Sequence, residues 1–192
     1  MIDVVLTARS GQRVRLRTLT SGEAGEFAGA VAGDLARLGE FLGWPERCAA
    51  PEGARAFLEA YEQQREGRVL HAGLWLDGWL VGGAILMHHD PVDAKAELGC
   101  WVTADGVGRG IVAVACRALI ALACDLGVQR LVWRCAPANV PSRTLAEHLG
   151  FVYEGTARSD YALRGERLDT DVLALVGAEL EVAAGGERNA LR

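Results

Sequence analysis

The sequence contains almost no lysine: Lys95 is the only one, and every other basic residue is an arginine. The 20 Lys and Arg residues are outnumbered by 25 Asp and Glu residues, which gives a formal net charge of −5. A protein that binds nucleic acid by neutralising phosphates has the opposite balance, so this chain is not expected to bind nucleic acid. An acidic protein is instead expected to meet a basic partner.

The sequence also lacks a CxxC pair, a basic and apolar leader at its start, and a long uninterrupted hydrophobic run. The most apolar stretch, Gly110 to Leu126, is broken by Arg117 and Asp125, which favours a buried helix over a membrane span. The five cysteines are an odd number, and several lie within apolar runs: Cys48, Cys100, Cys116, Cys124 and Cys135. These features predict a cytoplasmic protein with reduced thiols that does not bind membranes.

What the sequence does have is the composition of an ordinary globular domain, with 51% hydrophobic and 23% charged residues in a chain of 192. That length favours one domain, and neither a repeat nor a linker interrupts it. We predict a single domain over residues 1–182 and a flexible tail over 183–192.

Hydrophobic periodicity predicts a mixed α/β chain. Two strands and two helices are expected first, then a three-strand antiparallel meander, a central buried helix, a strand, a short helix and two last strands. In that order the elements are expected at 2–7, 14–19, 21–42, 51–65, 69–76, 79–87, 96–103, 110–126, 131–133, 141–149, 151–156 and 172–176. Residues 96–149 thus form a βαβ unit, and its ligand is expected where the first strand leads into its helix.

The segment at that point contains glycines at alternate positions, Gly106, Gly108 and Gly110. Several backbone N–H groups converge there at a helix N-terminus, an arrangement that binds anions. Because glycine has no Cβ, a pyrophosphate can approach the backbone closely, and Arg109 adds a positive charge. We therefore predict a phosphate-binding loop; the alternative is a tight turn without a ligand.

Two common nucleotide motifs fit poorly. The GxxxxGK[ST] pattern of P-loop proteins is absent. Residues 108–113 fit the G-x-G-x-x-A pattern of dinucleotide-binding folds, but the next strand ends at residues 133–136 without the expected carboxylate. The antiparallel meander also disagrees with a doubly wound sheet, so a dinucleotide fold is weakly supported.

Three segments carry a resemblance to a known family: residues 96–102, Gly-Arg-Gly-Ile at 108–111, and the run Asn-Val-Pro-Ser to Gly-Phe-Val-Tyr-Glu-Gly at 139–155. They resemble the GNAT superfamily of N-acetyltransferases, and within it the RimJ/RimL type, which acetylates N-terminal amines of ribosomal proteins. The likeness covers essentially the whole chain. It implies an α+β fold with a central mixed, mostly antiparallel sheet, flanked by helices and splayed where the acyl-CoA binds.

The resemblance also implies which residues contact acetyl-CoA, or another acyl-CoA donor. Val102 and Thr103 would pair with the pantetheine arm, and Asn139 and Ser142 would lie near that arm and the thioester sulfur. The pyrophosphate would be held by the backbone of Val107, Gly108, Arg109, Gly110 and Ile111. The chain departs from the family at Asp105, where a Gln or Arg is usual, so a side-chain contribution there is not expected.

Direct attack of an amine on a thioester requires a base and a group that supports the departing thiolate. No tyrosine lies between Asn139 and Gly150, so Ser142 is the candidate for the second task, as in the RimL-like pattern; alternatively Ser142 only satisfies backbone N–H groups at a helix start. Glu97 is the candidate base, because apolar neighbours favour an inward setting that raises a carboxyl pKa. Asp160 is the rival, from a region where RimL-like enzymes place a catalytic carboxylate.

Trp44 lies between the first two predicted helices, which in this family border the acceptor pocket; otherwise it covers the core. No metal site is expected, since His88 and His89 are adjacent on a strand and point to opposite faces. We predict an N-acetyltransferase that moves an acetyl group to a primary amine, on a basic protein N-terminus or a small molecule, in a ternary complex. The alternative is a CoA-binding regulatory protein with little or no turnover. A homodimer is possible in either case.

Overall fold

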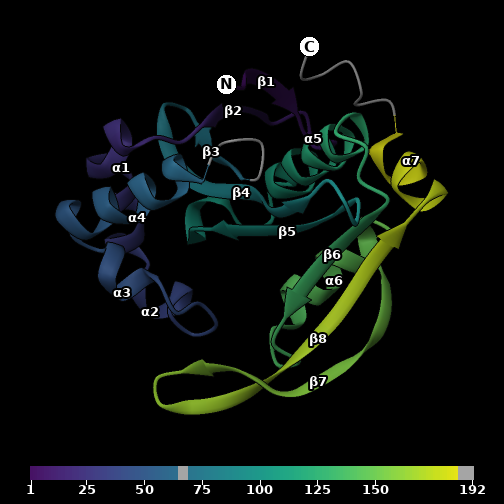
Figure 1. Cartoon of the computed structure of the whole chain (residues 1–192). Helices are drawn as coiled ribbons and strands as arrows, with labels where there is room; N and C mark the ends of the chain where they lie inside the picture. Colours follow the sequence, from purple (N-terminus) through teal and green to yellow (C-terminus); the bar gives the residue numbers. More distant parts are fainter. Residues whose placement is uncertain (65–68, 186–192) are drawn as a thin grey trace.

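The computed structural model describes residues 1–64 and 69–185, and it shows one sheet with helices on both faces (Figure 1). The strands are β1 (Asp3–Thr7), β2 (Arg13–Thr18), β3 (Leu70–Leu76), β4 (Trp79–Asp90), β5 (Lys95–Val102), β6 (Arg130–Cys135), β7 (Val152–Leu163) and β8 (Glu166–Val176). The helices are α1 (Ala24–Gly33), α2 (Leu35–Leu38), α3 (Pro45–Cys48), α4 (Pro51–Gln63), α5 (Ile111–Asp125), α6 (Val140–His148) and α7 (Ala178–Ala184), with 3₁₀ turns at Ser21–Glu23 and Ala104–Gly106.

Within the described residues the strands form one eight-stranded sheet in the order β1-β2-β3-β4-β5-β6-β8-β7. Every neighbouring pair is antiparallel except β5 and β6, which are parallel and are connected through α5. The predicted α+β class, the β3-β4-β5 meander and the βαβ unit are therefore confirmed.

Successive side chains of a strand point to opposite faces of the sheet, and each face carries its own hydrophobic core. On one face of the sheet α5 and α7 pack over residues such as Leu16 and Leu98, and on the other α1, α3 and α4 pack over Trp75 and Trp101. In β2 the arginines at 13 and 15 are exposed while Val14, Leu16 and Thr18 are buried, so this strand has one face in the core and one toward solvent.

The prediction of one helix over residues 21–42 is wrong, because the chain breaks at Asp34. This residue leaves helical geometry, with φ −138° and ψ 30°, and separates α1 from α2. Its carboxylate accepts hydrogen bonds from the backbone N–H of Ala104 and from Nε of Arg37, both at 2.8 Å. The break is thus associated with a contact 70 residues away in the chain, which local periodicity does not report.

The last two predicted strands, 151–156 and 172–176, are far too short. The residues between them, expected as a loop, form the β7–β8 hairpin, whose 12- and 11-residue strands extend to Leu163 and Glu166. Two register shifts, at Tyr153/Gly155 and Ala157/Tyr161, interrupt the pairing and hide the alternation in the sequence.

The last described element is α7, and it includes two residues that were expected in the flexible tail. Ala183 and Ala184 are buried against α5 in the first core, so the packed region extends past residue 182. The rest of the predicted tail, from residue 186, lies outside the described residues. Across residues 1–64 and 69–185, no helix has the length and apolar character needed to cross a membrane.

Candidate active site

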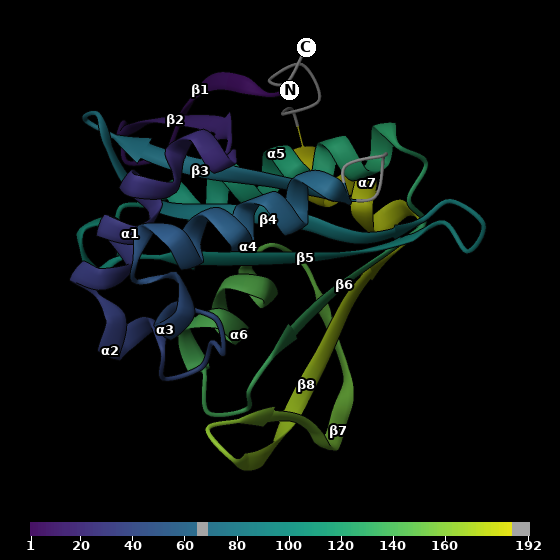
Figure 2. The same ribbon diagram turned by 60° about the vertical axis from the view of Figure 1, so that its left-hand side comes forward.

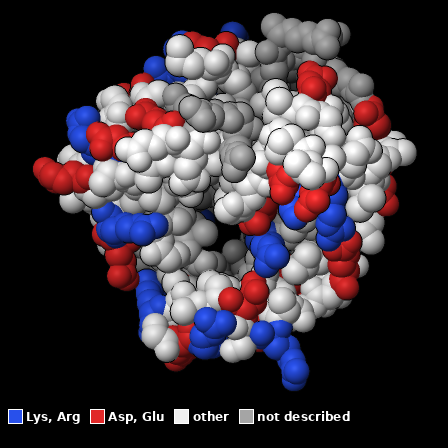
Figure 3. All heavy atoms as spheres, viewed as in Figure 1, with Lys and Arg blue, Asp and Glu red and all other residues white. Residues whose placement is uncertain are grey.

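The sheet opens between its two parallel strands. β5 and β6 pair only where Lys95–Glu97 meets Arg130–Val132, and beyond this point the strands separate. In Figure 2, β6, β8 and β7 diverge from the plane of β1 to β5. The space-filling view shows a deep hollow at the centre of this face (Figure 3). A mostly antiparallel sheet that is splayed at one point is the geometry that the sequence resemblance implied.

The glycine-rich loop lies at the end of β5 and leads directly into α5. Gly108 and Gly110 both have φ +74°, in the left-handed region that favours glycine. Gly110 is the residue before the helix, so the first N–H groups of α5, from Ile111 onward, have no preceding carbonyl to bond. A Cβ added at Gly108 would meet nothing within 4 Å. The predicted loop therefore has free donors and open space for a phosphate group.

The rest of the loop is held firmly behind this open side. A Cβ at Gly106 would lie 2.5 Å from Cγ2 of Val102, so this glycine is required by packing. The side chain of Arg109 donates from Nε to the carbonyl of Asp105 at 2.7 Å, and Ser10 donates its hydroxyl to the carbonyl of Arg109 at 3.1 Å. Arg109 is exposed, so its charge is available beside the loop.

The open edge of β5 presents the backbone of Val102. Thr103 donates its N–H and its hydroxyl to the carbonyl of Val81, at 2.8 and 3.2 Å, and its carbonyl accepts from Gly106 at 3.0 Å. Neighbouring residues of a strand direct their backbone groups to opposite edges, so Val102 faces away from β4. Its carbonyl accepts a hydrogen bond from the guanidinium of Arg37. Pairing with a pantetheine arm at this carbonyl would require Arg37 to move.

Ser142 lies on α6, on the far side of the opening from this edge. The cap of α6 is Asn139, whose Oδ1 accepts the N–H of Ser142 at 3.2 Å. The Ser142 hydroxyl accepts from the indole Nε1 of Trp133 at 3.0 Å. Because a hydroxyl also has one hydrogen to donate, Ser142 can direct that hydrogen toward a nearby sulfur. The hydroxyl is thus held by β6 and does not serve as the helix cap.

The thiol of Cys135 lies beside Ser142. Burial raises the pKa of this thiol, and a hydrogen bond from Ser142 opposes the rise. A hydrogen bond to the charged form of a sulfur favours that form, so the single hydrogen of Ser142 would stabilise another thiolate if it turned from Cys135 toward it.

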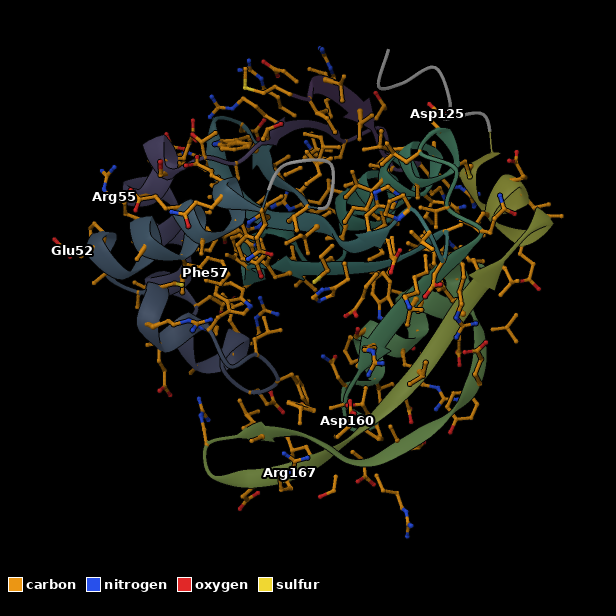
Figure 4. All side chains as sticks on the ribbon, viewed as in Figure 1. Glu52, Arg55, Phe57, Asp125, Asp160 and Arg167 are labelled. Carbon is orange, nitrogen blue, oxygen red and sulfur yellow. The ribbon has the colours of Figure 1, made fainter. Side chains whose placement is uncertain are left out.

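Glu97 and Asp160, the two candidate bases, are brought together by a residue that the sequence analysis missed. Arg134 on β6 lies with Nε 3.7 Å from Oε2 of Glu97 and with its Nη1 3.1 Å from Oδ2 of Asp160. Burial raises the pKa of Glu97, whereas His88 and Arg134 lower it and Asp160 raises it. Figure 4 shows Asp160 on the β7–β8 side of the hollow, with Phe57 of α4 on the opposite side. The predicted inward setting of Glu97 agrees with this environment.

These carboxylates and Ser142 lie on opposite faces of the opened sheet. Leu98 and Trp133 belong to the core beneath α5 and α6. The alternation of side chains therefore places their neighbours Glu97 and Arg134 on the other face, with α1 to α4. The opening joins a side that carries the glycine-rich loop and Ser142 to a side that carries two carboxylates. An acyl donor and an amine acceptor can thus meet from opposite faces.

Trp44 belongs to a cluster of aromatic side chains on the same face of the sheet as the two carboxylates. It stacks on Phe27 and Phe57, with ring centroids 5.6 and 5.4 Å apart, and meets Trp101 edge-on at 5.7 Å. It is half-buried and packs against the second core. Tyr61 of α4 extends this aromatic group, and burial raises the pKa of its phenol, as does the nearby charge of Glu97.

Fold and site together define a GNAT acetyltransferase. A model of the acetyltransferase (GNAT) domain matches residues 13–152, about three quarters of the chain. The chain belongs to this family and is an N-acetyltransferase that uses acetyl-CoA.

The proteins that this chain is similar to include enzymes named for ribosomal substrates. The Bacillus subtilis (strain 168) protein YdaF, assigned by name to the ribosomal N-acetyltransferases, is 31% identical over 183 residues, which cover 92% of this chain and 98% of YdaF. RimL, the ribosomal L7/L12 α-N-protein acetyltransferase, in complex with coenzyme A, has a TM-score of 0.83 at 20% identity and covers 93% of this chain and 99% of its own. Mycobacterium smegmatis RimJ, in complex with a CoA disulfide, has a TM-score of 0.82 at 23% identity, covering 96% and 95%. These two structural likenesses show the fold.

Proposed function

We propose that this chain acetylates the α-amino group of a protein N-terminus, with acetyl-CoA as donor. The observation that carries the proposal is the group formed by Glu97, Arg134 and Asp160 at the mouth of the opened sheet, across from Ser142. Two carboxylates against one guanidinium favour a cationic acceptor, as does the net charge of −5. The ribosomal substrates in the names of YdaF and RimL support a protein acceptor.

Acetyl-CoA would bind across the splay as a substrate. The glycine-rich loop would hold its pyrophosphate through backbone N–H groups from Gly108 to Ile111, and Arg109 would add charge. The N–H of Val107, also expected to contribute, already donates to the carbonyl of Ala104 at 3.2 Å. The pantetheine would lie along the open edge of β5 at Val102, with Asn139 and Ser142 facing its far end. The thioester would then lie between Ser142 and the carboxylates.

In the reaction, the amine nitrogen forms a bond to the thioester carbonyl carbon, and a carboxylate of the acceptor side takes the proton that the ammonium loses. Collapse of the tetrahedral intermediate breaks the C–S bond, and the electron pair leaves on the CoA sulfur. Ser142 donates a hydrogen bond to this thiolate, which is where charge develops. The amide nitrogen still carries a second proton, which passes to the CoA thiolate as the C–S bond breaks, and the carboxyl returns its own proton to water. The products are the N-acetylated acceptor and CoA as its thiol.

The test is an assay of CoA release from acetyl-CoA with three matched peptides, followed by mass spectrometry of the products. One peptide has a free N-terminus, one has a blocked N-terminus and a single lysine, and one has neither amine. We expect turnover and a mass shift at the free N-terminus alone. Transfer only to the lysine would contradict the proposed acceptor. Binding of acetyl-CoA without any transfer would support a CoA-binding regulatory protein.

A further inference from the structure

Both carboxylates of the acceptor side share one cation, and they share it unequally. Asp160 accepts from Nη1 of Arg134 at 3.1 Å, a hydrogen-bonding distance, whereas Oε2 of Glu97 is 3.7 Å from Nε. The three side chains come from β7, β6 and β5, so the contact crosses the opening of the sheet. Each remains partly accessible, with 34%, 44% and 24% of the side chain exposed for Asp160, Arg134 and Glu97.

We propose that Arg134 is a positioning residue that decides which carboxylate accepts the amine's proton: it binds Asp160 as a fixed counter-ion and leaves Glu97 as the base. This inference rests on the proposed function and resolves the choice between Glu97 and Asp160. Asp160 then contributes by drawing Arg134 away from Glu97, and it does not itself receive the proton.

Other charged groups around Glu97 do not provide this arrangement. His88 on β4 lowers the pKa of Glu97, and the charge of Glu97 in turn raises the pKa of Tyr61 on α4. Neither makes a hydrogen bond or ion pair with it that would hold the carboxylate in place. Only Arg134, among the described residues, forms ion pairs with both carboxylates.

In this arrangement Arg134 and Asp160 have opposite effects on the pKa of Glu97. Arg134 lowers the pKa of Glu97 and Asp160 raises it. Arg134→Gln should therefore move the acidic limb of kcat/KM to higher pH, by about one unit; this is the low end of the effect of a neighbouring opposite charge because Arg134 is partly exposed. Asp160→Asn should move the limb to lower pH, since it removes a like charge and frees Arg134 to turn toward Glu97.

The experiment measures pH profiles of kcat/KM for the wild type, Arg134→Gln, Asp160→Asn and Glu97→Gln, with acetyl-CoA and an N-terminal peptide. Arg130→Gln is the matched control, because Arg130 lies on the same strand and binds Glu154 of β7 at 2.8 and 2.5 Å, away from the opening. Arg134→Lys keeps the charge and should restore most of the wild-type profile. At pH values below the acidic limbs of both the wild type and Arg134→Gln, we expect kcat/KM of the variant to be about tenfold lower. The acidic limb of Arg130→Gln should stay at the wild-type pH.

A second readout does not need turnover: titration of the Glu97 carboxyl carbon by NMR, with its resonance identified as the one lost in Glu97→Gln. The Glu97 pKa should rise in Arg134→Gln and fall in Asp160→Asn. Unchanged titration in both variants overturns the inference, and so does loss of the acidic limb in Asp160→Asn with its retention in Glu97→Gln. If the wild type titrates as expected but transfers no acetyl group, the proposed function fails and the electrostatic coupling stands.

Discussion

Substituting Gly108 with alanine tests whether the glycine-rich loop exists for a ligand. Gly108 has φ +74°, and an alanine there must adopt a conformation that costs an L residue about 1–2 kcal/mol. The free energy of unfolding should fall by about that amount, which lowers the melting temperature by roughly 2–4 °C per kcal/mol for a domain of this size. No steric clash adds to this cost, because the new Cβ would meet nothing within 4 Å.

The chain offers a matched control at the opposite end of α5. Gly127 has φ +77°, and an added Cβ there would also meet nothing within 4 Å. Gly127→Ala should therefore lose about as much stability as Gly108→Ala. Only Gly108→Ala should weaken the binding of acetyl-CoA, because its methyl group occupies the space beside the free N–H groups of the loop. Disturbing one charge-assisted hydrogen bond is worth about 1.5–3 kcal/mol, a loss of affinity of about tenfold or more.

The assay pairs urea unfolding of both variants with calorimetric titration of acetyl-CoA. We expect equal losses of stability and unequal losses of affinity. If the two variants bind acetyl-CoA as tightly as the wild type, the loop does not hold the pyrophosphate. If Gly127→Ala weakens binding as much as Gly108→Ala, the effect is one of general stability and the reasoning is refuted.

Three further predictions concern other parts of the site and core. Ser142→Ala should lower kcat about tenfold or more while the acetyl-CoA dissociation constant stays the same, because the hydrogen bond to the departing thiolate forms only during the reaction; the indole of Trp133 also loses its acceptor, which should lower stability. A higher dissociation constant with normal kcat would assign Ser142 to binding instead. Asp171→Asn should lower the free energy of unfolding by about 2 kcal/mol, since this buried carboxylate accepts from Arg143 at 2.8 Å and Thr156 at 2.6 Å, and a loss near zero in urea melts would contradict that role. Burial raises the pKa of the Cys48 thiol from 9.0 to about 11, so iodoacetamide at pH 8 should leave Cys48 unlabelled in the folded protein and label it in urea, as mass spectrometry can check. Because the folded thiol keeps its proton where the unfolded one loses it, Cys48 also makes the fold less stable as the pH rises from 9 to 11.

The sequence predicts the central part of the fold well because that part carries strong local signals. The strand before residue 103, the glycines that follow and the apolar helix over 110–126 specify β5, the loop and α5 without reference to anything else. The cofactor side of the site follows from the same signals. The break at Asp34 could not be predicted in this way, since its partner Ala104 is distant in the sequence.

The acceptor side of the site is harder to predict because its residues come from three separate strands. Glu97, Arg134 and Asp160 are spread over more than 60 residues, and the strand that carries Arg134 was expected to end at Trp133. A signal was nevertheless present: in a parallel βαβ unit, residues near Glu97 on the first strand face residues near Val132 on the second, so an arginine two positions on is a natural neighbour. Asp160 lies within the second register shift of β7, between Ala157 and Tyr161, where no alternation in the sequence indicates which way it points.

The short ladder between β5 and β6 has a consequence for how the molecule opens. Only three residue pairs of that ladder join the two halves of the sheet, Lys95–Glu97 with Arg130–Val132. With so little shared hydrogen bonding, we expect β6, β8 and β7 to be joined to β1 to β5 mainly by the first core that they share, and to open more easily than the rest of the sheet. A ligand that spans the gap would contact both parts of the sheet, and its binding would stabilise each of them against opening. Protection of β7 and β8 amides against hydrogen exchange would then depend on the acyl-CoA concentration, although neither strand contributes to the phosphate loop.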